Sequence, residues 1–229
     1  MATALRIEDL SFRYDRRAID APPVVRVDRF ELGAGEMALL RGRSGSGKTT
    51  LLGLIAGLLE PSLGRVEIAG QHLHALRGAA RDHFRGRHLG VVFQTFNLLH
   101  GFSARENVLA GMMFSDIPKS EHAARASALL ERLGIERVDA RPEELSVGQQ
   151  QRVAVARAVA ARPTLVLADE PTASLDPENA DAAIELVKEA CAEAGAALLC
   201  VSHDPSASSH FERVEDLASL AGIHAAGPA

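Results

Sequence analysis

Residues 37–59 read MALLRGRSGSGKTTLLGLIAGLL, and this stretch decides the fold. The apolar run at its start is typical of a buried strand, and the apolar segment at its end indicates a buried helix. Between them, the loop from Gly42 to Thr49 fits the pattern Gly-x-x-x-x-Gly-Lys-Ser/Thr. A strand, a glycine-rich loop and a helix in this order form the arrangement in which the pattern binds nucleotide phosphates.

Each residue type in this loop has a chemical role. Glycines let backbone N–H groups turn toward phosphate oxygens, and the start of the helix adds positive potential. Lys48 is expected to reach the β- and γ-phosphates, where its charge serves the reaction, and Thr49 to offer a hydroxyl to Mg²⁺. The residues expected to bind the nucleotide here are Arg43, Ser44, Gly45, Ser46, Gly47, Lys48, Thr49 and Thr50. The loop alone leaves a kinase, a GTPase, a helicase and a transporter ATPase as alternatives.

A second apolar run, LVLADE at residues 165–170, ends in two acids. Charges at the end of a buried strand are costly unless they face a cleft or a cation. Asp169 is placed to hold Mg²⁺ through its water shell, and Glu170 to polarise the water that attacks a phosphate. The alternative is an ordinary turn at the end of a strand, which the phosphate loop elsewhere in the chain makes the weaker interpretation.

Apolar periodicity organises the rest of the chain. Alternation over residues 4–14, 24–32 and 64–73 predicts strands of an antiparallel layer near the N-terminus. After residue 146, helical segments alternate with buried strands, which predicts a parallel sheet.

A helical region lies between these two parts. Residues 106–133 have a helical pattern, with a break at Pro118 and a capping glycine, Gly134, after the second segment. Residues of about 95–160 are therefore expected to form a helical insert. The C-terminal segment 211–229 lacks a strand ending in Asp-Gly, and no accessory regulatory domain is expected there.

Composition limits the functional class. The net charge of −5 and the pI near 6.0 argue against nucleic acid as a partner, because phosphate-backbone binding needs clustered Lys and Arg. Cys191 and Cys200 form no C-x-x-C pair and are expected to be buried thiols. No apolar stretch approaches the roughly 20 residues that span a bilayer, and the N-terminus does not resemble a signal peptide, so we expect a cytoplasmic protein.

Residues 145–152, LSVGQQQR, open a helix with Ser146 as a natural N-cap. Exposed N–H groups at such a start can meet a phosphate, although the same pattern by itself is also that of an ordinary capped helix. Beside a phosphate loop, the segment resembles the signature motif of the ATP-binding cassette (ABC) family. The resemblance implies that Ser146, Gly148 and Gln149 contact nucleotide.

The resemblance extends over nearly the whole chain, because the family's other motifs follow in the family's order. It implies that Tyr14 stacks on adenine, that Gln94 joins Mg²⁺ and the attacking water to a membrane partner, and that His203 contacts the γ-phosphate. Asp176, in Ser-Leu-Asp at 174–176, would also belong to the nucleotide site. Taken singly, Tyr14 is as well explained as a strand aromatic, Gln94 as a loop amide and His203 as a histidine at the end of a strand.

The family's fold is an α/β P-loop NTPase (RecA-like) core with an antiparallel β subdomain and a helical insert, here one domain over residues 1–229. A chain with one phosphate loop and one signature is expected to dimerise with ATP and Mg²⁺ at the interface, as a homodimer. ATP hydrolysis would then move an integral membrane permease, with the chain peripheral at the cytoplasmic face of the membrane. The alternative is an ATPase that regulates a signalling or cell-wall complex without transport.

Two stretches narrow the resemblance to the lipoprotein-release and macrolide-export group. They are VFQTFNLL with the following ARENV, at residues 92–99 and 104–108, and the QQQR that ends the signature. By likeness, residues 93–99 would help form a groove for a short helix of the membrane partner. For Phe96 and Leu98, packing in the core is the equal alternative. A soluble DNA-repair or ribosome-associated cassette is disfavoured because coiled-coil insertions and basic surfaces are absent from the sequence.

One departure from the family concerns the signature. Val147 stands where the family usually has glycine. If the position needs a positive φ or a close backbone approach, a β-branched side chain there would lower turnover.

Overall fold

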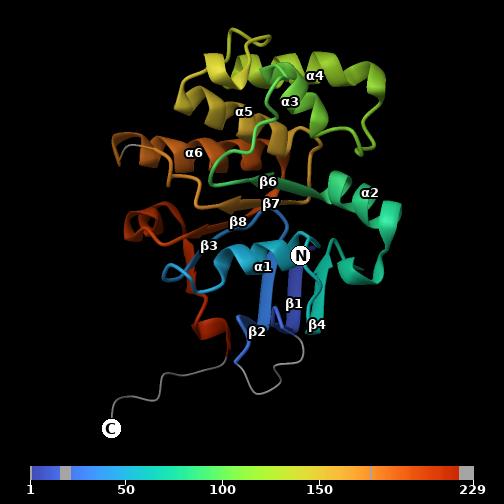
Figure 1. Cartoon of the computed structure of the whole chain (residues 1–229), viewed down its shortest axis with the longest axis vertical. Coiled ribbons are helices and arrows are strands. Elements are labelled where there is room, and N and C mark those ends of the chain that lie inside the picture. Colours follow the sequence, from blue (N-terminus) through green and yellow to red (C-terminus); the bar gives the residue numbers. More distant parts are fainter. Residues whose placement is uncertain (1, 16–21, 176, 222–229) are drawn as a thin grey trace.

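The computed structural model describes residues 2–15, 22–175 and 177–221, which form two sheets flanked by helices (Figure 1). An antiparallel sheet has the strand order β2-β1-β4-β5, and a parallel sheet has the order β6-β7-β8-β3-β9. Helix α1 lies between the two sheets, and α3, α4 and α5 form a layer at the end of the molecule opposite the antiparallel sheet. The predicted α/β class with an antiparallel layer is confirmed.

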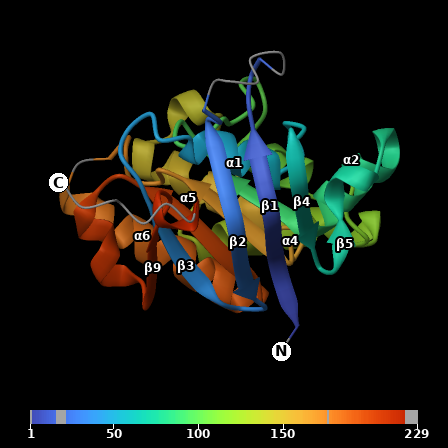
Figure 2. The same cartoon turned by 90° about the horizontal axis from the view of Figure 1, so that it is seen from below.

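The antiparallel sheet comes from the alternating segments near the N-terminus, and Figure 2 shows it from outside. Its strands are β1 (Thr3–Phe12), β2 (Val25–Gly33), β4 (Leu63–Ile68) and β5 (Gln71–His72). The alternation over 64–73 is divided into a hairpin, because Ala69 and Gly70 both have positive φ, 50° and 76°. Successive residues of this kind make the tight turn that suits a hairpin.

The parallel sheet carries the segments that end in polar residues. It consists of β6 (Leu89–Val92), β7 (Leu165–Asp169), β8 (Ala197–Ser202), β3 (Met37–Arg41) and β9 (Arg213–Asp216). The C-terminal segment lacks Asp-Gly, as noted from the sequence, but it does contain a strand, since Arg213–Asp216 pairs in parallel with β3 and is followed by Leu217. This edge strand is short and largely charged, so its pairing depends on the free edge of β3 and not on an apolar pattern.

In the part of the chain that the structure describes, six α-helices accompany the sheets. They are α1 (Lys48–Ile55), α2 (Gly78–His88), α3 (Ala104–Ala110), α4 (Lys119–Arg132), α5 (Val147–Val159) and α6 (Pro177–Ala194). Helix α1 ends before the predicted residue 59, since Gly57 takes φ +67°. Helix α2 was not predicted, because it buries none of its residues and so shows no apolar stripe. As predicted, Gly134, with φ +73°, follows the end of α4.

The buried side chains form three apolar clusters. Alternate residues of β7 divide between two of them: Leu165 and Leu167 face α1 and the antiparallel sheet, whereas Val166 and Ala168 face α5 and α6. The third cluster lies within the layer of α3, α4 and α5. Both cysteines are buried, as predicted. Within the described ranges, no helix combines the length and apolar character needed to cross a bilayer.

A candidate ATP-binding and hydrolysis site

A cavity of about 390 Å³ lies where the parallel strands end. Parallel strands deliver the residues that follow them to one edge of a sheet, and ligands of open α/β sheets bind at that edge. The phosphate loop follows β3, Gln94 follows β6, Glu170 follows β7 and His203 follows β8. The cavity is lined by Tyr14, Val24, Ser44, Gly45, Gly47, Lys48, Thr49, Thr50, Gln94, Glu170 and His203.

The phosphate loop takes a shape that requires its glycines. Gly45 and Gly47 have φ values of +77° and +92°. A Cβ on Gly47 would lie 2.7 Å from the Val24 carbonyl oxygen, and a Cβ on Gly42 would lie 2.5 Å from Ser46 Oγ. No heavy atom of the described residues lies within 4 Å of a Cβ position on Gly45, so among these residues the backbone there is open to an approaching group.

Lys48 begins α1 and is almost fully buried, with 6% of its surface exposed. Its Nζ donates to the Gly42 carbonyl at 2.7 Å and to the Arg43 carbonyl at 3.2 Å. The same nitrogen lies 3.3 Å from Glu170 Oε1. The ammonium group is therefore held over the loop at the point where phosphate oxygens would meet it.

Asp169 and Glu170 end β7 in different environments. Burial raises the pKa of Asp169 above its ordinary value, and the nearby Glu170 carboxylate raises it further, while a hydrogen bond from Thr49 opposes this. Burial alone would also raise the pKa of Glu170, but hydrogen bonds from His203 and Ser202 outweigh it and leave that pKa below its ordinary value. Glu170 therefore stays ionised at neutral pH in spite of its burial.

Glu170 is held by contacts on both sides. His203 Nδ1 lies 2.9 Å from Oε1, and Oε2 accepts from the Ser202 hydroxyl at 3.1 Å and the His203 N–H at 3.2 Å. Glu170 itself has φ +46°, a conformation that non-glycine residues rarely adopt and that is concentrated at functional sites. No role for Ser202 was predicted from the sequence. Its position next to His203, at the end of a buried strand, could have indicated that its hydroxyl belongs to the site.

The residues present fit a phosphate and a divalent cation. Ser46 Oγ is buried and has no hydrogen-bond partner among the described residues. Thr49 Oγ1 donates to Asp169 Oδ1 at 3.3 Å, so a hydroxyl and a carboxylate already share one point beside the cavity. Oxygen ligands of this kind are those that Mg²⁺ binds in phosphate sites.

Tyr14 and Gln94 stand at the rim. The Tyr14 ring is 70% exposed and packs edge-on against Phe12, and its hydroxyl lies 3.2 Å from Thr50 Oγ1. Gln94 is exposed, and its carbonyl accepts from the Ser174 hydroxyl at 3.0 Å. Both are thus positioned with an uncovered polar or aromatic face at the cavity mouth.

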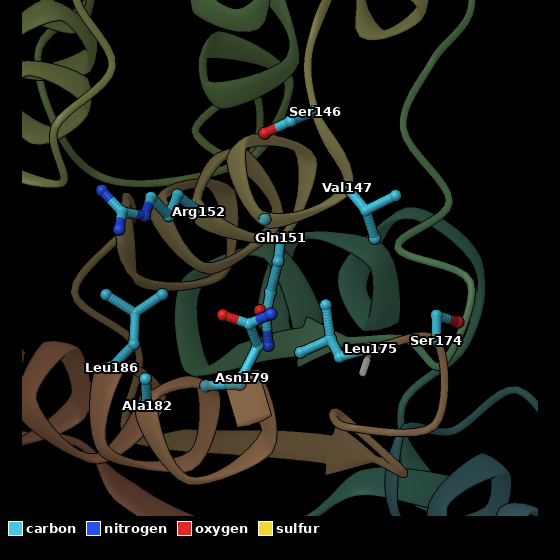
Figure 3. A pocket seen from close by; sticks show the side chains of 11 residues that line it. Ser146, Val147, Gln151, Arg152, Ser174, Leu175, Asn179, Ala182 and Leu186 are labelled. Carbon is cyan, nitrogen blue, oxygen red and sulfur yellow. The ribbon is translucent and has the colours of Figure 1, made fainter. Parts of the chain in front are cut away.

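The signature residues lie in a second cavity, of about 550 Å³, between the start of α5 and α6 (Figure 3). Ser146 and Gly148 line it, and Figure 3 shows Gln151 and Asn179 pointing toward each other inside it. Ser146 caps α5 as predicted: its Oγ accepts from the Gln149 N–H, and the Gln149 side chain accepts from the Ser146 N–H. Among the residues that the structure describes, none lines both cavities.

Val147 does not strain the signature. It is the first residue of α5, is absent from the described residues with positive φ, and leaves 49% of its surface exposed. The condition of a positive φ, under which Val147 would lower turnover, is therefore not met in this chain. Within the described ranges, no heavy atom lies within 4 Å of a Cβ position on Gly148, so none of these residues covers this face of the helix start.

Two residues of the phosphate loop, Arg43 and Ser46, are not among those that line the phosphate cavity. Arg43 is exposed and contributes its carbonyl to Lys48, and the buried Ser46 hydroxyl faces Gly42, where an added Cβ would lie 2.5 Å from it. Asp176 lies outside the described residues.

The apolar stretch after Gln94 divides between core and surface. Phe96 and Leu98 are 5% and 8% exposed and belong to the cluster of the helical layer, whereas Leu99 is 43% exposed. For Phe96 and Leu98 the core interpretation holds, and the expectation that Phe96 faces a partner is wrong. Leu99 and the nearby Phe102, at 48%, provide exposed apolar surface.

Comparison with known proteins agrees with this geometry. The family described as ABC transporter matches residues 25–173. The chain is 45% identical over 194 residues to the lipoprotein-releasing system ATP-binding protein LolD of Chromohalobacter salexigens, covering 83% of this chain and 82% of the relative. The protein of the same name from Pseudomonas fluorescens is 44% identical over 187 residues, with 81% and 82% covered.

A solved structure extends the likeness to the fold. The dimeric structure of a post-hydrolysis state of the ATP-binding cassette MJ0796, bound to ADP and Pi, matches with a TM-score of 0.77 at 31% identity and covers 93% of each chain. This likeness confirms the predicted P-loop NTPase fold. From the phosphate loop, the acids at the end of β7 and these relatives together, it follows that the chain belongs to the ATP-binding cassette family of transporter ATPases.

Proposed function

We propose that this chain hydrolyses Mg-ATP as a head-to-tail dimer and uses the resulting motion to drive a membrane partner in a lipoprotein-release type of transporter. The observation that carries the proposal is the meeting of Lys48, Glu170 and His203 at one cavity, with the Thr49–Asp169 pair beside it. A cation for phosphates, an ionised carboxylate and a hydroxyl–carboxylate pair are what hydrolysis of a nucleotide requires.

Each side chain then has a distinct role. Lys48 binds the β- and γ-phosphates and offsets negative charge that develops in the transition state. Glu170, kept ionised by His203 and Ser202, orients and polarises the attacking water, and His203 also contacts the γ-phosphate. Tyr14, exposed at the rim, stacks on adenine.

The cation site is formed by Thr49, Asp169 and Gln94. The Thr49 hydroxyl and the Asp169 carboxylate already lie together, and Gln94 lines the same cavity as Thr49. A bound Mg²⁺ would neutralise phosphate charge and help hold the reacting oxygens in line.

Dimerisation is supported by the separation of the two cavities. Ser146, Gly148 and Gln149 lie at the start of α5 and contribute nothing to the lining of the phosphate cavity of their own chain. The start of a helix is a phosphate-binding group, and this one presents an open face at Gly148. A second copy, placed head to tail, would bring this face to the γ-phosphate. The similar cassette solved with ADP and Pi is dimeric, which supports a nucleotide-bound dimer here.

The membrane partner is inferred from the relatives. Both curated proteins are named as ATP-binding proteins of a lipoprotein-releasing system. We therefore place the chain at the cytoplasmic face of the membrane, held there by an integral membrane subunit. Exposed apolar side chains at Leu99 and Phe102 are candidates for that contact.

The substitution Glu170→Gln tests the proposal. It keeps the size of the side chain but removes the carboxylate, so turnover should fall about 10²–10⁴-fold while ATP binding persists. The slowed hydrolysis should also trap an ATP-bound dimer that size-exclusion chromatography resolves. Glu193→Gln, on the exposed face of α6, is the matched control and should hydrolyse ATP normally. Turnover of the Glu170 variant close to the wild-type rate would reject Glu170 as the group that activates water.

A further inference from the structure

The segment that follows Gln94 contains two successive residues in an unfavourable backbone conformation. Phe96 and Asn97 have φ values of +57° and +45°, and neither is glycine. A left-handed conformation costs free energy at each such residue, although asparagine tolerates it better than phenylalanine. Two in succession persist only when contacts from elsewhere hold them.

The contacts come from Arg157 on α5. Its Nη2 donates to the Phe96 carbonyl at 2.5 Å, and its Nη1 donates to the Asn97 carbonyl at 2.6 Å. A planar guanidinium can address two adjacent oxygens in this way, and a charged donor strengthens both bonds. The guanidinium thus binds the two strained peptide groups themselves.

Among the described residues, the Phe96 and Asn97 carbonyls are the acceptors on which the Arg157 guanidinium depends. Burial lowers the pKa of Arg157, and the described residues give it no ion pair with a carboxylate. Its stem packs on the end of α3, where a Cβ on Gly111 would lie 3.2 Å from Arg157 Cγ and 2.4 Å from its carbonyl oxygen. A partly buried charge of this kind depends on its two acceptors.

Arg157 also joins two parts of the proposed mechanism. It belongs to α5, the helix whose first turn carries Ser146 and Gly148. The segment that it holds begins two residues after Gln94, whose own carbonyl is fixed by Ser174. Through the two hydrogen bonds of Arg157, a displacement of α5 would therefore also move the backbone just after Gln94, which positions that side chain at the phosphate cavity.

We propose that Arg157 is a positioning residue that holds residues 96–97 in their left-handed turn and couples movement of the signature helix to the placement of Gln94. The effect on hydrolysis rests on the proposed function, in which Gln94 takes part in catalysis. The effect on the backbone does not, so the two can be measured separately.

The test replaces Arg157 by Met, which keeps the apolar stem, and by Lys, which keeps the charge but cannot bind both carbonyls in one plane. In Arg157→Met we expect amide hydrogen exchange over residues 93–99 to rise about tenfold or more, because two charge-assisted hydrogen bonds are lost. The kcat for ATP should fall by a similar factor with little change in KM. Arg157→Lys should lie between this variant and wild type.

Arg125→Met is the matched control. Arg125 is also half-buried in the helical layer, burial lowers its pKa as well, and its Nε donates to a single backbone carbonyl, that of Ala160, at 2.6 Å. Its loss should leave exchange over residues 93–99 and kcat unchanged. If this variant lowers kcat as much as Arg157→Met does, the effect of Arg157 is general stability of the layer, and the proposal is rejected.

Rescue provides the second readout. Asn97→Gly lowers the free-energy cost of the left-handed conformation at this position. The double variant Arg157→Met/Asn97→Gly should therefore recover part of the lost kcat. A double variant no better than Arg157→Met, together with unchanged exchange in Arg157→Met, would overturn the proposal. Gln94→Ala is measured alongside: if it hydrolyses ATP at the wild-type rate, the proposed role of Gln94 fails, and exchange over residues 93–99 alone then decides whether Arg157 holds the turn.

Discussion

Lys48 Nζ lies 3.3 Å from Glu170 Oε1, and both side chains are almost fully buried. The cation of the phosphate loop and the carboxylate proposed to activate water thus neutralise each other across the cavity. An entering phosphate competes with Glu170 for Lys48, which would turn the carboxylate toward a water. Through this contact, binding of the nucleotide phosphates would free the Glu170 carboxylate to activate the water.

Lys48→Ala should abolish ATP hydrolysis, because it removes the charge that binds the phosphates and stabilises the transition state. The fold should persist, since His203, Ser202 and the His203 N–H still hold Glu170. A steady-state ATPase assay and far-ultraviolet circular dichroism check both points. Lys119→Ala, at the exposed start of α4, is the control and should be fully active. Hydrolysis by the Lys48 variant within about tenfold of wild type would exclude this role.

Ser146→Arg should bind ATP but fail to hydrolyse it, since a bulky side chain at the start of α5 would displace the signature from the γ-phosphate of the one site that this helix completes. Mixing this variant with Lys48→Ala gives a sharper result. In a head-to-tail dimer both substitutions fall in the same site, so the mixed dimer retains one intact site and regains activity. If each chain used its own signature, both sites would be defective and the mixture would stay inactive. The ATPase rate of the mixture against each variant alone decides between them.

The pH dependence of stability should change in Glu170→Gln. The pKa of Glu170 is depressed by folding from its ordinary 4.5, so the carboxylate stabilises the native state above that pH. Its contribution is lost as the pH falls through the lower, folded-state pKa. We therefore expect the free energy of unfolding in urea, measured as the pH is lowered from about 6 to about 3.5, to fall more for wild type than for the Gln variant. A constant difference across this range would contradict the depressed pKa.

Charged substitutions after Gln94 should separate core from surface. Phe96→Asp should lower the melting temperature strongly, because it places a charge in the apolar cluster of the helical layer. Leu99→Asp should leave thermal stability and ATP binding unchanged, because this side chain is exposed. The same Leu99 variant should lose co-purification with the membrane protein that accompanies wild type. Unchanged co-purification would remove Leu99 from the partner interface.

Local features of the molecule followed from the sequence, because the interactions that create them join neighbouring residues. The phosphate loop needs only its own glycines, Lys48 and the start of α1. Ser146 caps α5 through Gln149, three residues along, and the strand ending in Asp169 and Glu170 is an uninterrupted apolar run. The approach of the acids to Lys48 was also predictable, since parallel strands end at one edge of the sheet.

What only the tertiary structure decided depends on contacts between distant residues. The left-handed turn at Phe96 and Asn97 breaks the apolar period, so the pattern could not show that Phe96 points inward and Leu99 outward. Arg157 meets that turn from 60 residues away. Strand β9 forms on the open edge of β3, with little apolar signal of its own. In each case the stabilising free energy comes from contacts with a surface that forms only when the chain folds. A local sequence pattern therefore cannot predict it.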